Sequence, residues 1–216
     1  MGRMSTTVDV MARGRPRGFD ADRALEEAMA LFWRRGYRAV TTRDLEATLG
    51  LSQSSISNAF GAKADLLAAA VARYQERFAA EVLGALAAGP GLDAVDDFLD
   101  RLAAWLSADG VRGCLVSRLM SEGGLEAEAP ARAVAAHRSQ VRGALASALR
   151  RAADAGDMPA EGLGERTALL SGAVLGMNLT AVAGGTADEV AAIAAGARAE
   201  VAAWRRAARP TAAGAG

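Results

Sequence analysis

The 216-residue sequence has only one cysteine and one histidine, which excludes several classes of protein. With a single cysteine, Cys114, no intrachain disulfide can form, and the chain fits a reducing compartment. A nucleophilic cysteine needs a base that can reach it, and a metal site needs several ligands. His137 lies on a different predicted helix from Cys114 and completes neither kind of site. We therefore predict no catalytic residue, no metal site and no cofactor, and the chain is not expected to be an enzyme.

Aromatic residues and prolines are also scarce, at 5% of the sequence and five residues respectively. Alanine is abundant, and no alternating strand pattern or internal repeat is present, so the composition favours helices. The hydrophobic content of 51% is enough to bury a core in one or two domains. These features predict an all-α fold of about nine helices.

The longest uncharged run, residues 167–187, is the segment to consider as a membrane span. It contains several glycine, serine, threonine and asparagine residues, and its mean hydropathy is too low for insertion. We expect a helix buried between protein surfaces instead. Residues 1–18 are polar and contain arginines rather than the pattern of a signal peptide, so we predict a cytoplasmic protein with no membrane partner.

The formal net charge is zero, so the charge of the whole chain does not indicate a nucleic-acid partner. Its distribution is more informative. Residues 1–75 contain eleven Lys or Arg against eight Asp or Glu, and residues 76–216 contain fourteen against seventeen. A net charge of +3 on the first part and −3 on the second suits a DNA-binding head and a body that does not touch DNA.

Residues 41–60 have the pattern of two short helices joined by a glycine turn. Thr41 is a good N-cap for the first helix, Gly50 can end it in the left-handed conformation, and Ser52 can cap the second. The second helix carries short hydroxyl and amide side chains, which are groups that contact base edges and phosphates. The pattern predicts a helix-turn-helix with residues 53–59 as recognition helix, although an ordinary helical hairpin has the same local signals.

The residues around this pattern make the helix-turn-helix interpretation specific. In chain order they are Gly14-Arg15-Pro16-Arg17, Ala30-Leu31-Phe32, Gly36-Tyr37, Thr41-Thr42, Gly50-Leu51-Ser52 and Phe60-Gly61-Ala62-Lys63. This series resembles the N-terminal domain of the tetracycline-repressor (TetR) family of bacterial transcription regulators, over about residues 13–75. One position departs from the family pattern. The family usually has a tyrosine that contacts a phosphate where this chain has Ser57.

The resemblance implies which residues contact DNA. A lysine at the position of Lys63, the only lysine in the chain, binds a phosphate near the start of a long helix, predicted here over residues 63–87. Arginines in a disordered arm, residues 1–17, are expected to enter the adjacent minor groove, although a solubilising tail has the same composition. The predicted DNA-binding residues are Arg13, Arg15, Arg17, Thr41, Thr42, Arg43, Gln53, Ser54, Ser55, Ser57, Asn58 and Lys63.

Glycines and prolines divide the rest of the chain into helices at about 92–107, 112–122, 127–155, 162–183 and 186–207. A ligand-gated regulator needs a mostly apolar cavity with a few polar groups. Cys114 lies in a Gly-Cys-Leu segment that resembles the start of a cavity-lining helix in some TetR-type regulators. It is either a small buried residue or a ligand or redox sensor. The predicted ligand-binding residues are Trp105, Cys114, Ser117, Met120, His137, Met177 and Asn178.

One recognition helix offers too little surface for tight and selective binding, so we predict a homodimer that reads a palindromic operator. In residues 162–183 no charge follows Arg166, and small residues on one face let another helix approach closely. Together with the last helix, this segment is expected to form an isologous four-helix interface, unless both are buried inside a monomer. The predicted interface residues are Ala168, Gly172, Gly176, Ala183, Val190, Ile193, Ala197, Val201 and Trp204.

The expected organisation is a basic arm (1–17), a helix-turn-helix domain (18–65), a ligand-binding and dimerisation domain (66–208) and a frayed tail (209–216). The function implied by the resemblance is a dimeric, sequence-specific repressor that binds double-stranded DNA and is released by a small-molecule effector. A transcriptional activator or a ligand-independent regulator would have the same sequence features. A structural helical interaction protein is the alternative from another functional class.

Overall fold

The computed structural model describes residues 19–111, 113–122 and 128–208, which form ten α-helices and one π-helical segment, with no strand among them. The all-α prediction is therefore confirmed. The helices are α1 (Ala21–Arg35), α2 (Thr42–Leu49), α3 (Gln53–Phe60), α4 (Lys63–Phe78), η1 (Ala79–Leu83), α5 (Ala85–Ala88), α6 (Asp93–Val111), α7 (Leu115–Ser121), α8 (Glu128–Asp154), α9 (Leu163–Val182) and α10 (Ala187–Ala208).

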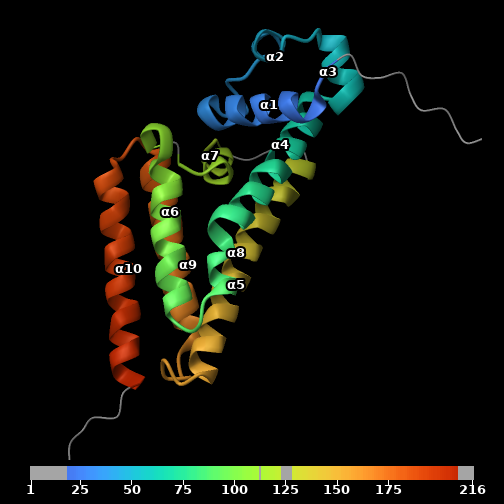
Figure 1. Ribbon diagram of the computed structural model, residues 1–216. Helices are drawn as coiled ribbons and strands as arrows, with labels where there is room; N and C mark the ends of the chain where they lie inside the picture. The colour runs from blue at the N-terminus through green and yellow to red at the C-terminus, as the bar shows by residue number, and fades with distance from the viewer. Residues whose placement is uncertain (1–18, 112, 123–127, 209–216) are drawn as a thin grey trace, which may run out of the picture.

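The first three helices and the start of α4 form a small head at one end of the molecule (Figure 1). Phe32 of α1, Leu45 of α2, Ile56 of α3 and Leu66 of α4 are all buried and belong to its core. Helices α2 and α3 lie on the side of α1 that faces away from the body (Figure 1). The head therefore presents its helix-turn-helix outward.

Helix α4 belongs to both parts of the molecule, since it packs against α1 in the head and against α8 in the body. The predicted unbroken helix over residues 63–87 is interrupted by η1, where the N–H of Gly84 donates to the carbonyl of Ala79 at 2.9 Å. Such π-helical turns are rare and locally change the direction of a helix. The predicted domain boundary at residue 65 falls inside α4, and the division into two domains stays a prediction.

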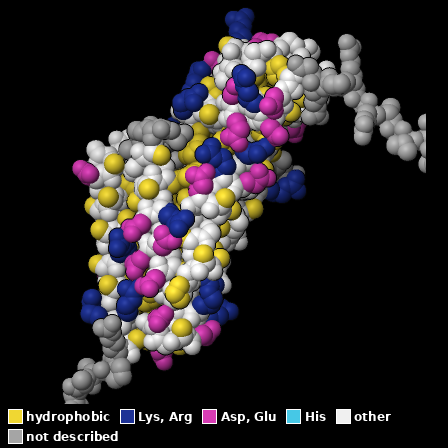
Figure 2. Space-filling model, viewed as in Figure 1, with side chains coloured by type: hydrophobic (Ala, Val, Ile, Leu, Met, Phe, Trp, Pro, Cys, Tyr) yellow, Lys and Arg dark blue, Asp and Glu magenta, His cyan; other side chains and the backbone are white. Residues whose placement is uncertain are grey.

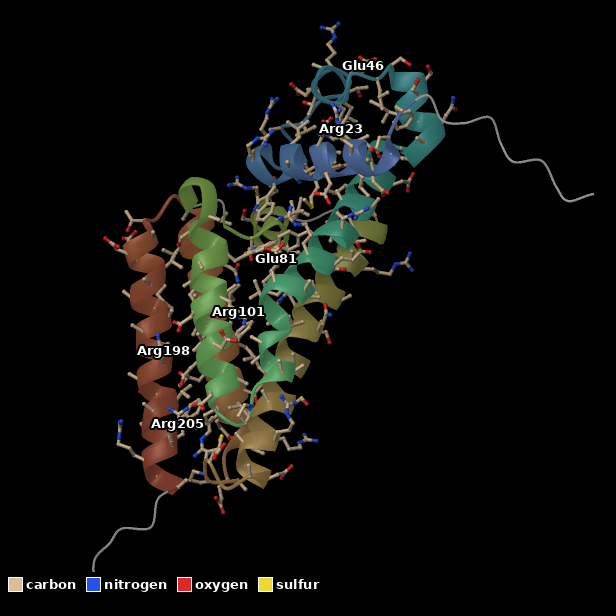
Figure 3. All side chains as sticks on the ribbon, in the orientation of Figure 1. Arg23, Glu46, Glu81, Arg101, Arg198 and Arg205 are labelled. Atoms are coloured by element: carbon tan, nitrogen blue, oxygen red, sulfur yellow. The ribbon has the colours of Figure 1, made fainter. Side chains whose placement is uncertain are left out.

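The body is a bundle in which α6 packs against α9 and α10, and α8 packs against α4 and α9. Arg198 and Arg205 on α10 bridge to α6, with Arg198 2.7 Å from Asp100 and Arg205 2.6 Å from Asp93 (Figure 3). Figure 2 shows basic and acidic side chains intermixed on this face of the body. Exposed ion pairs of this kind contribute about 0–1 kcal/mol each, so apolar packing stabilises the bundle.

The uncharged run that was considered as a membrane span is mostly α9, which lies behind α6 in the view of Figure 1. Leu170 and Met177 of this helix are fully buried in the core of the bundle. Among the described helices, none has both the length and the apolar character that crossing a bilayer requires.

Candidate functional site

Helices α2 and α3 are joined by the tight turn that the sequence predicts. Gly50 adopts a φ of 63° in the left-handed region, and its N–H donates to the carbonyl of Glu46. Only glycine takes this conformation without a steric cost. Ser52 then caps α3, because its hydroxyl accepts from the N–H of Ser55 at 3.3 Å. These local signals set the angle between the two helices.

The start of α2 is held by a capping box. The Thr41 hydroxyl accepts from the N–H of Asp44 at 3.2 Å, and the Asp44 carboxylate accepts from the N–H of Thr41 at 2.8 Å. Hydrogen bonds from Thr41, with a further contribution from Arg35, lower the pKa of Asp44 to about 2. Thr41 therefore shapes the helix terminus, while Thr42 and Arg43 beside it are exposed.

The polar face of α3 points away from the core of the head. Ile56 is buried, and the N–H of Gln53 donates to the Glu46 carboxylate at 2.8 Å, which ties α3 to α2. Ser55 is half-buried, and its hydroxyl lies 3.0 Å from that of Ser52. The predicted contact residues with exposed side chains on this helix are Gln53, Ser54, Ser57 and Asn58.

Lys63 occupies the first position of α4, where the helix dipole disfavours a cation. Its ammonium group lies 4.2 Å from the ring centroid of Tyr37, in a cation–π contact. Burial lowers the pKa of Lys63, and the carboxylates of Glu122 and Asp44 oppose that shift. The three arginines of the arm, Arg13, Arg15 and Arg17, lie outside the described residues.

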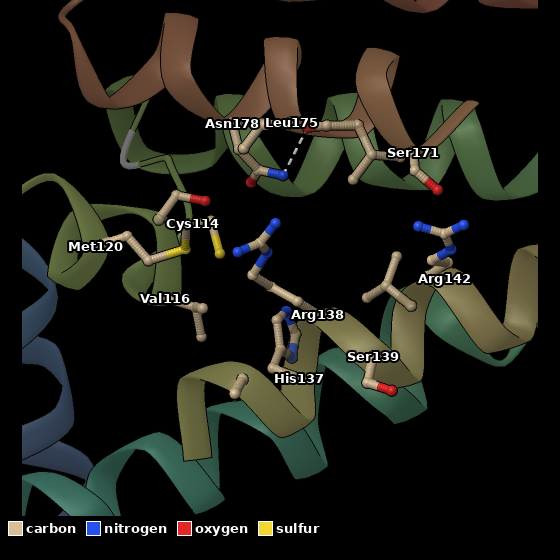
Figure 4. Close-up of a pocket in the computed structure, with 14 residues that line it drawn as sticks. Cys114, Val116, Met120, His137, Arg138, Ser139, Arg142, Ser171, Leu175 and Asn178 are labelled. Carbon is tan, nitrogen blue, oxygen red and sulfur yellow. Dashed lines mark hydrogen bonds between the residues drawn. The ribbon is translucent and has the colours of Figure 1, made fainter. Parts of the chain in front are cut away.

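The body contains a cavity of about 410 Å³ between α7, α8 and α9 (Figure 4). Most of its walls are apolar, with a few polar groups, as in small-molecule sites generally. The structure brings five of the predicted ligand-binding residues together in its lining: Cys114, Ser117, Met120, His137 and Asn178. Sequence reasoning missed the two arginines of the lining, Arg138 and Arg142, which stand one helical turn apart on α8.

Two predicted ligand-binding residues do not line this cavity. Met177 is fully buried in the core of the bundle. Trp105 packs among the aromatic rings of Trp33, Tyr74 and Phe78, with centroid distances of 5.7, 5.9 and 6.0 Å. Helical spacing indicates which side is buried but not what lies there, and a ligand contact of either residue stays a prediction.

The cavity is polar at its buried side. The hydroxyl of Tyr74 donates to the sulfur of Cys114 at 3.2 Å, and the Asn178 amide donates to the carbonyl of Val174 at 2.7 Å. His137 packs against the Phe78 ring at 5.0 Å, and burial lowers the pKa of His137 to about 4. Its imidazole is therefore neutral at physiological pH.

Helix α7 connects this cavity to the head at both of its ends. The indole N–H of Trp33 on α1 donates to the carbonyl of Gly113 at 3.0 Å, just before α7 begins. After α7 ends, the Glu122 carboxylate accepts from the backbone N–H groups of Tyr37 and Arg38, both at 3.1 Å. A side chain at Gly36, where φ is 77°, would overlap the Glu122 carboxylate. Glycine at 36 is therefore needed for this contact as well as for ending α1.

The predicted dimer face on α9 remains open in the subunit. Ala168, Gly172 and Ala183 are exposed, and Gly176 is half-buried. Sequence reasoning missed the leucines that accompany these small residues. The large apolar side chains exposed in the described part of the chain all lie on α9, and they are Leu169, Leu175 and Leu179.

Most of the residues predicted on α10 for the dimer interface are buried within the subunit. Val190, Ala197, Val201 and Trp204 are buried in the subunit's own core, because α10 packs against α6 and α9. The half-buried Ile193 packs near Gly176 of the same chain. The stripe on α10 therefore stabilises the bundle, and its part in a dimer stays a prediction.

Comparison with known proteins agrees with this architecture. Residues 24–70 match the family model for bacterial regulatory proteins of the tetR family. The chain is 42% identical over 77 residues to the HTH-type transcriptional repressor ComR of Escherichia coli (strain K12), and 30% identical over 105 residues to the uncharacterized HTH-type transcriptional regulator YezE of Bacillus subtilis (strain 168). These alignments cover 36% and 48% of this chain, but only 37% of ComR and 54% of YezE.

Solved structures extend the likeness to most of the chain. A cysteine-substituted TetR family transcriptional regulator, CifR, complexed with 26 bp double-strand operator DNA, is 28% identical and has a TM-score of 0.79. The match covers 88% of this chain and 100% of CifR. A TetR family transcriptional regulator from Agrobacterium tumefaciens shares the fold, with a TM-score of 0.75 over 85% of this chain and 96% of its own, at 23% identity. The head, the body and these relatives together show that the chain resembles the tetR family of bacterial regulatory proteins, in the sequence of its head and in its overall fold.

Proposed function

We propose that this protein is a dimeric, sequence-specific transcriptional repressor that leaves its operator when a small molecule occupies the cavity. We propose no catalytic role for it. We propose that it acts in the cytoplasm, where its DNA target lies. The observation that carries the proposal is the outward polar face of α3, which Ile56 and the contact between Glu46 and Gln53 hold in place. The operator-bound CifR structure supports the same use of the head in this chain.

The side chains of α3 suit the reading of base edges. Gln53 and Asn58 are exposed amides, which can form two hydrogen bonds with adenine in the major groove. Ser54 and Ser57 add hydroxyls that can bind either a base or a phosphate. Selection of bound sequences from a random DNA library tests the proposal directly. A palindrome with half-sites about one helical turn apart supports a dimeric reader, and recovery of no preferred sequence contradicts the function.

Lys63 is expected to bind a phosphate. Lys63→Met keeps a long unbranched side chain beside Tyr37 and removes the charge that lies over its ring, so it should weaken binding to all sequences about equally. The slope of log affinity against log salt should decrease by up to about one charge unit. Titrations of operator and random DNA at several salt concentrations measure both effects.

Asn58→Ala provides the contrasting control on the recognition helix. If Asn58 makes a bidentate base contact, its loss should cost about 1–3 kcal/mol on the operator and relax selectivity at one position, with the salt slope unchanged. If Lys63→Met left both the DNA affinity and the salt slope unchanged, Lys63 would not be a phosphate contact.

The exposed leucines and small residues of α9 are the surface that we assign to the dimer. Leu169 and Leu179 are each 44% exposed, and no charged residue follows Arg166 on this helix. A contiguous apolar face of this kind usually marks an interaction site. A second copy of the same face would cover it in an isologous interface, as a palindromic operator requires.

Helix α7 is the element that we propose couples the cavity to the head. Ser117 and Met120 face the cavity from this helix, while Glu122 at its end holds the backbone between α1 and α2. A ligand that displaces α7 would therefore move the anchor of the head. Coupling of this kind requires different contacts with the ligand in the two states.

Glu122→Ala is expected to uncouple the head from the cavity. The variant should keep operator affinity within a fewfold of the native protein and bind the effector normally, because Glu122 does not line the cavity. The fall in operator affinity on adding effector should be lost. The measurement is operator titration with and without an effector that releases the native protein.

Glu81→Ala is the matched control for this prediction. Glu81 is exposed and pairs with Arg77 of the neighbouring turn at 3.4 Å, so it has no part in the contact between α7 and the head (Figure 3). It should behave as the native protein does. Full effector response in Glu122→Ala would show that the signal takes another route.

A further inference from the structure

Two buried polar atoms in the cavity lack a partner within the described structure. They are Oδ1 of Asn178 and Nδ1 of His137, on side chains that are only 7% and 6% exposed. A buried polar group left without a hydrogen bond costs about 1–3 kcal/mol, so such groups usually have a partner in the functional state. Both atoms belong to residues that line the same cavity from facing helices. These two atoms are therefore available to form hydrogen bonds with a molecule inside the cavity.

The charge of the cavity residues indicates the class of ligand that would form these hydrogen bonds. Arg138 and Arg142 line the cavity, and no Asp or Glu is among the described residues around it. Neither arginine has an ion pair with a described residue. In Figure 4 the Arg138 side chain extends from α8 toward Asn178, and that of Arg142 extends toward Ser171. Like charges one turn apart on a helix repel each other unless an anion lies between them.

The rest of the wall combines mostly small apolar side chains with three serines. Val116, Val141, Val174 and Leu175 contribute aliphatic surface, and the volume of about 410 Å³ is in the range for a single small organic molecule. Arginine binds carboxylate, sulfonate and phosphate groups through paired N–H donors, which gives both affinity and orientation. Both arginines are exposed, so water solvates them when the cavity is empty. An uncharged or cationic ligand would form no charge-assisted hydrogen bonds with these two guanidinium groups.

We infer that the effector is a small amphipathic organic anion, whose apolar body fills the cavity and whose acidic group binds Arg138 and Arg142. The inference rests on the proposed ligand-responsive function and names the ligand class of that same cavity. The acidic group binds at the arginine side, while Asn178 and His137 form hydrogen bonds with polar substituents on the otherwise apolar body.

A pair of fluorescent probes tests this class without DNA. Anilinonaphthalene sulfonate and N-phenylnaphthylamine share an aromatic body, and only the first carries an anionic group. The sulfonate is expected to bind the full-length protein at least about tenfold more tightly, an increment equal to about 1.4 kcal/mol. Arg138→Gln should remove about that factor for the sulfonate and change binding of the uncharged amine less than about twofold.

Arg150→Gln is the matched control, because Arg150 is an exposed arginine of the same helix that does not line the cavity. It should leave both affinities unchanged, and circular dichroism checks that each variant folds. Equal binding of the two probes to the native protein overturns the inference, as does an equal loss of both probes in Arg138→Gln.

The outcome is separable from that of the proposed function. A preference for the sulfonate that depends on Arg138 supports the ligand class even if DNA selection recovers no operator. If the protein binds an operator but shows no preference for the sulfonate, the inferred ligand class is wrong and the DNA-binding function still stands.

Discussion

Gly172→Arg is expected to convert the protein to monomers and to reduce operator affinity by at least about a hundredfold. The substitution places a charge at the centre of the exposed apolar face of α9, between Leu169 and Leu175. An isologous interface would contain the new arginine twice, without a partner, and burying an unpaired charge costs several kcal/mol. The loss of operator affinity follows because two linked heads exceed the affinity of one by about 10²–10⁴.

Sedimentation of the variant measures the oligomeric state, and operator titration measures the affinity. Gly172 is the best position for the test, since a Cβ there meets no other atom of the subunit within 4 Å. At Gly176 a Cβ would lie 3.9 Å from the Ile193 side chain, so a large residue would also disturb the packing of α9 on α10.

Gly143→Arg is the matched control. Gly143 is an exposed glycine inside α8, and a Cβ added there would also meet no atom within 4 Å, so the same change is made in the same kind of local structure. This variant should remain dimeric and bind operator normally. If Gly172→Arg also sediments as a dimer, the subunits associate through a different surface.

The helix-turn-helix could be predicted from sequence because its signals are local. Thr41, Gly50 and Ser52 each act within four residues of their own position, through a cap or a turn. The contact between Glu122 and the N–H of Tyr37 is different, because the two residues are 85 positions apart. No spacing in the sequence pairs them, and the second role of Gly36 follows only from that pairing.

The sequence is least specific for the body where a buried face has more than one possible neighbour. The stripe that includes Val201 and Trp204 is buried in the subunit, and helical periodicity cannot distinguish the subunit's own α6 from a partner. The same limit moved Trp105 from the cavity wall to an aromatic cluster. Arg138 was overlooked for the opposite reason, because an arginine on a polar helix face resembles any other solvated charge.

His137 should make the stability of the protein depend on pH over a narrow range. Burial lowers the pKa of His137 from an ordinary 6.5 to about 4. Its imidazole is 6% exposed and packs against the rings of Tyr74 and Phe78, and no carboxylate among the described cavity residues offsets the loss of solvation. The folded state therefore opposes protonation, whereas the unfolded chain accepts the proton near pH 6.5.

As the pH falls from about 6.5 to about 4, the unfolded chain binds more protons than the folded protein, so the free energy of unfolding should decrease. A difference of this size in pKa corresponds to a loss of about 3 kcal/mol, which is complete below the folded pKa and absent above pH 7. His137→Phe keeps an aromatic ring in place and removes the titration, so its stability should lack this component. Denaturant unfolding of both proteins between pH 7 and pH 4 measures the difference.

The chain offers an independent measurement of the same quantity, since His137 is its only histidine. The imidazole C–H resonances in the proton NMR spectrum therefore all come from this residue, and they report its pKa without any assignment by mutation. A midpoint near pH 4 is expected, and between pH 5 and 6.5 carboxylates contribute little to the comparison because they titrate lower. A resonance that titrates near pH 6.5 would show that the imidazole is solvated, and the difference in stability between the native protein and His137→Phe would then be independent of pH.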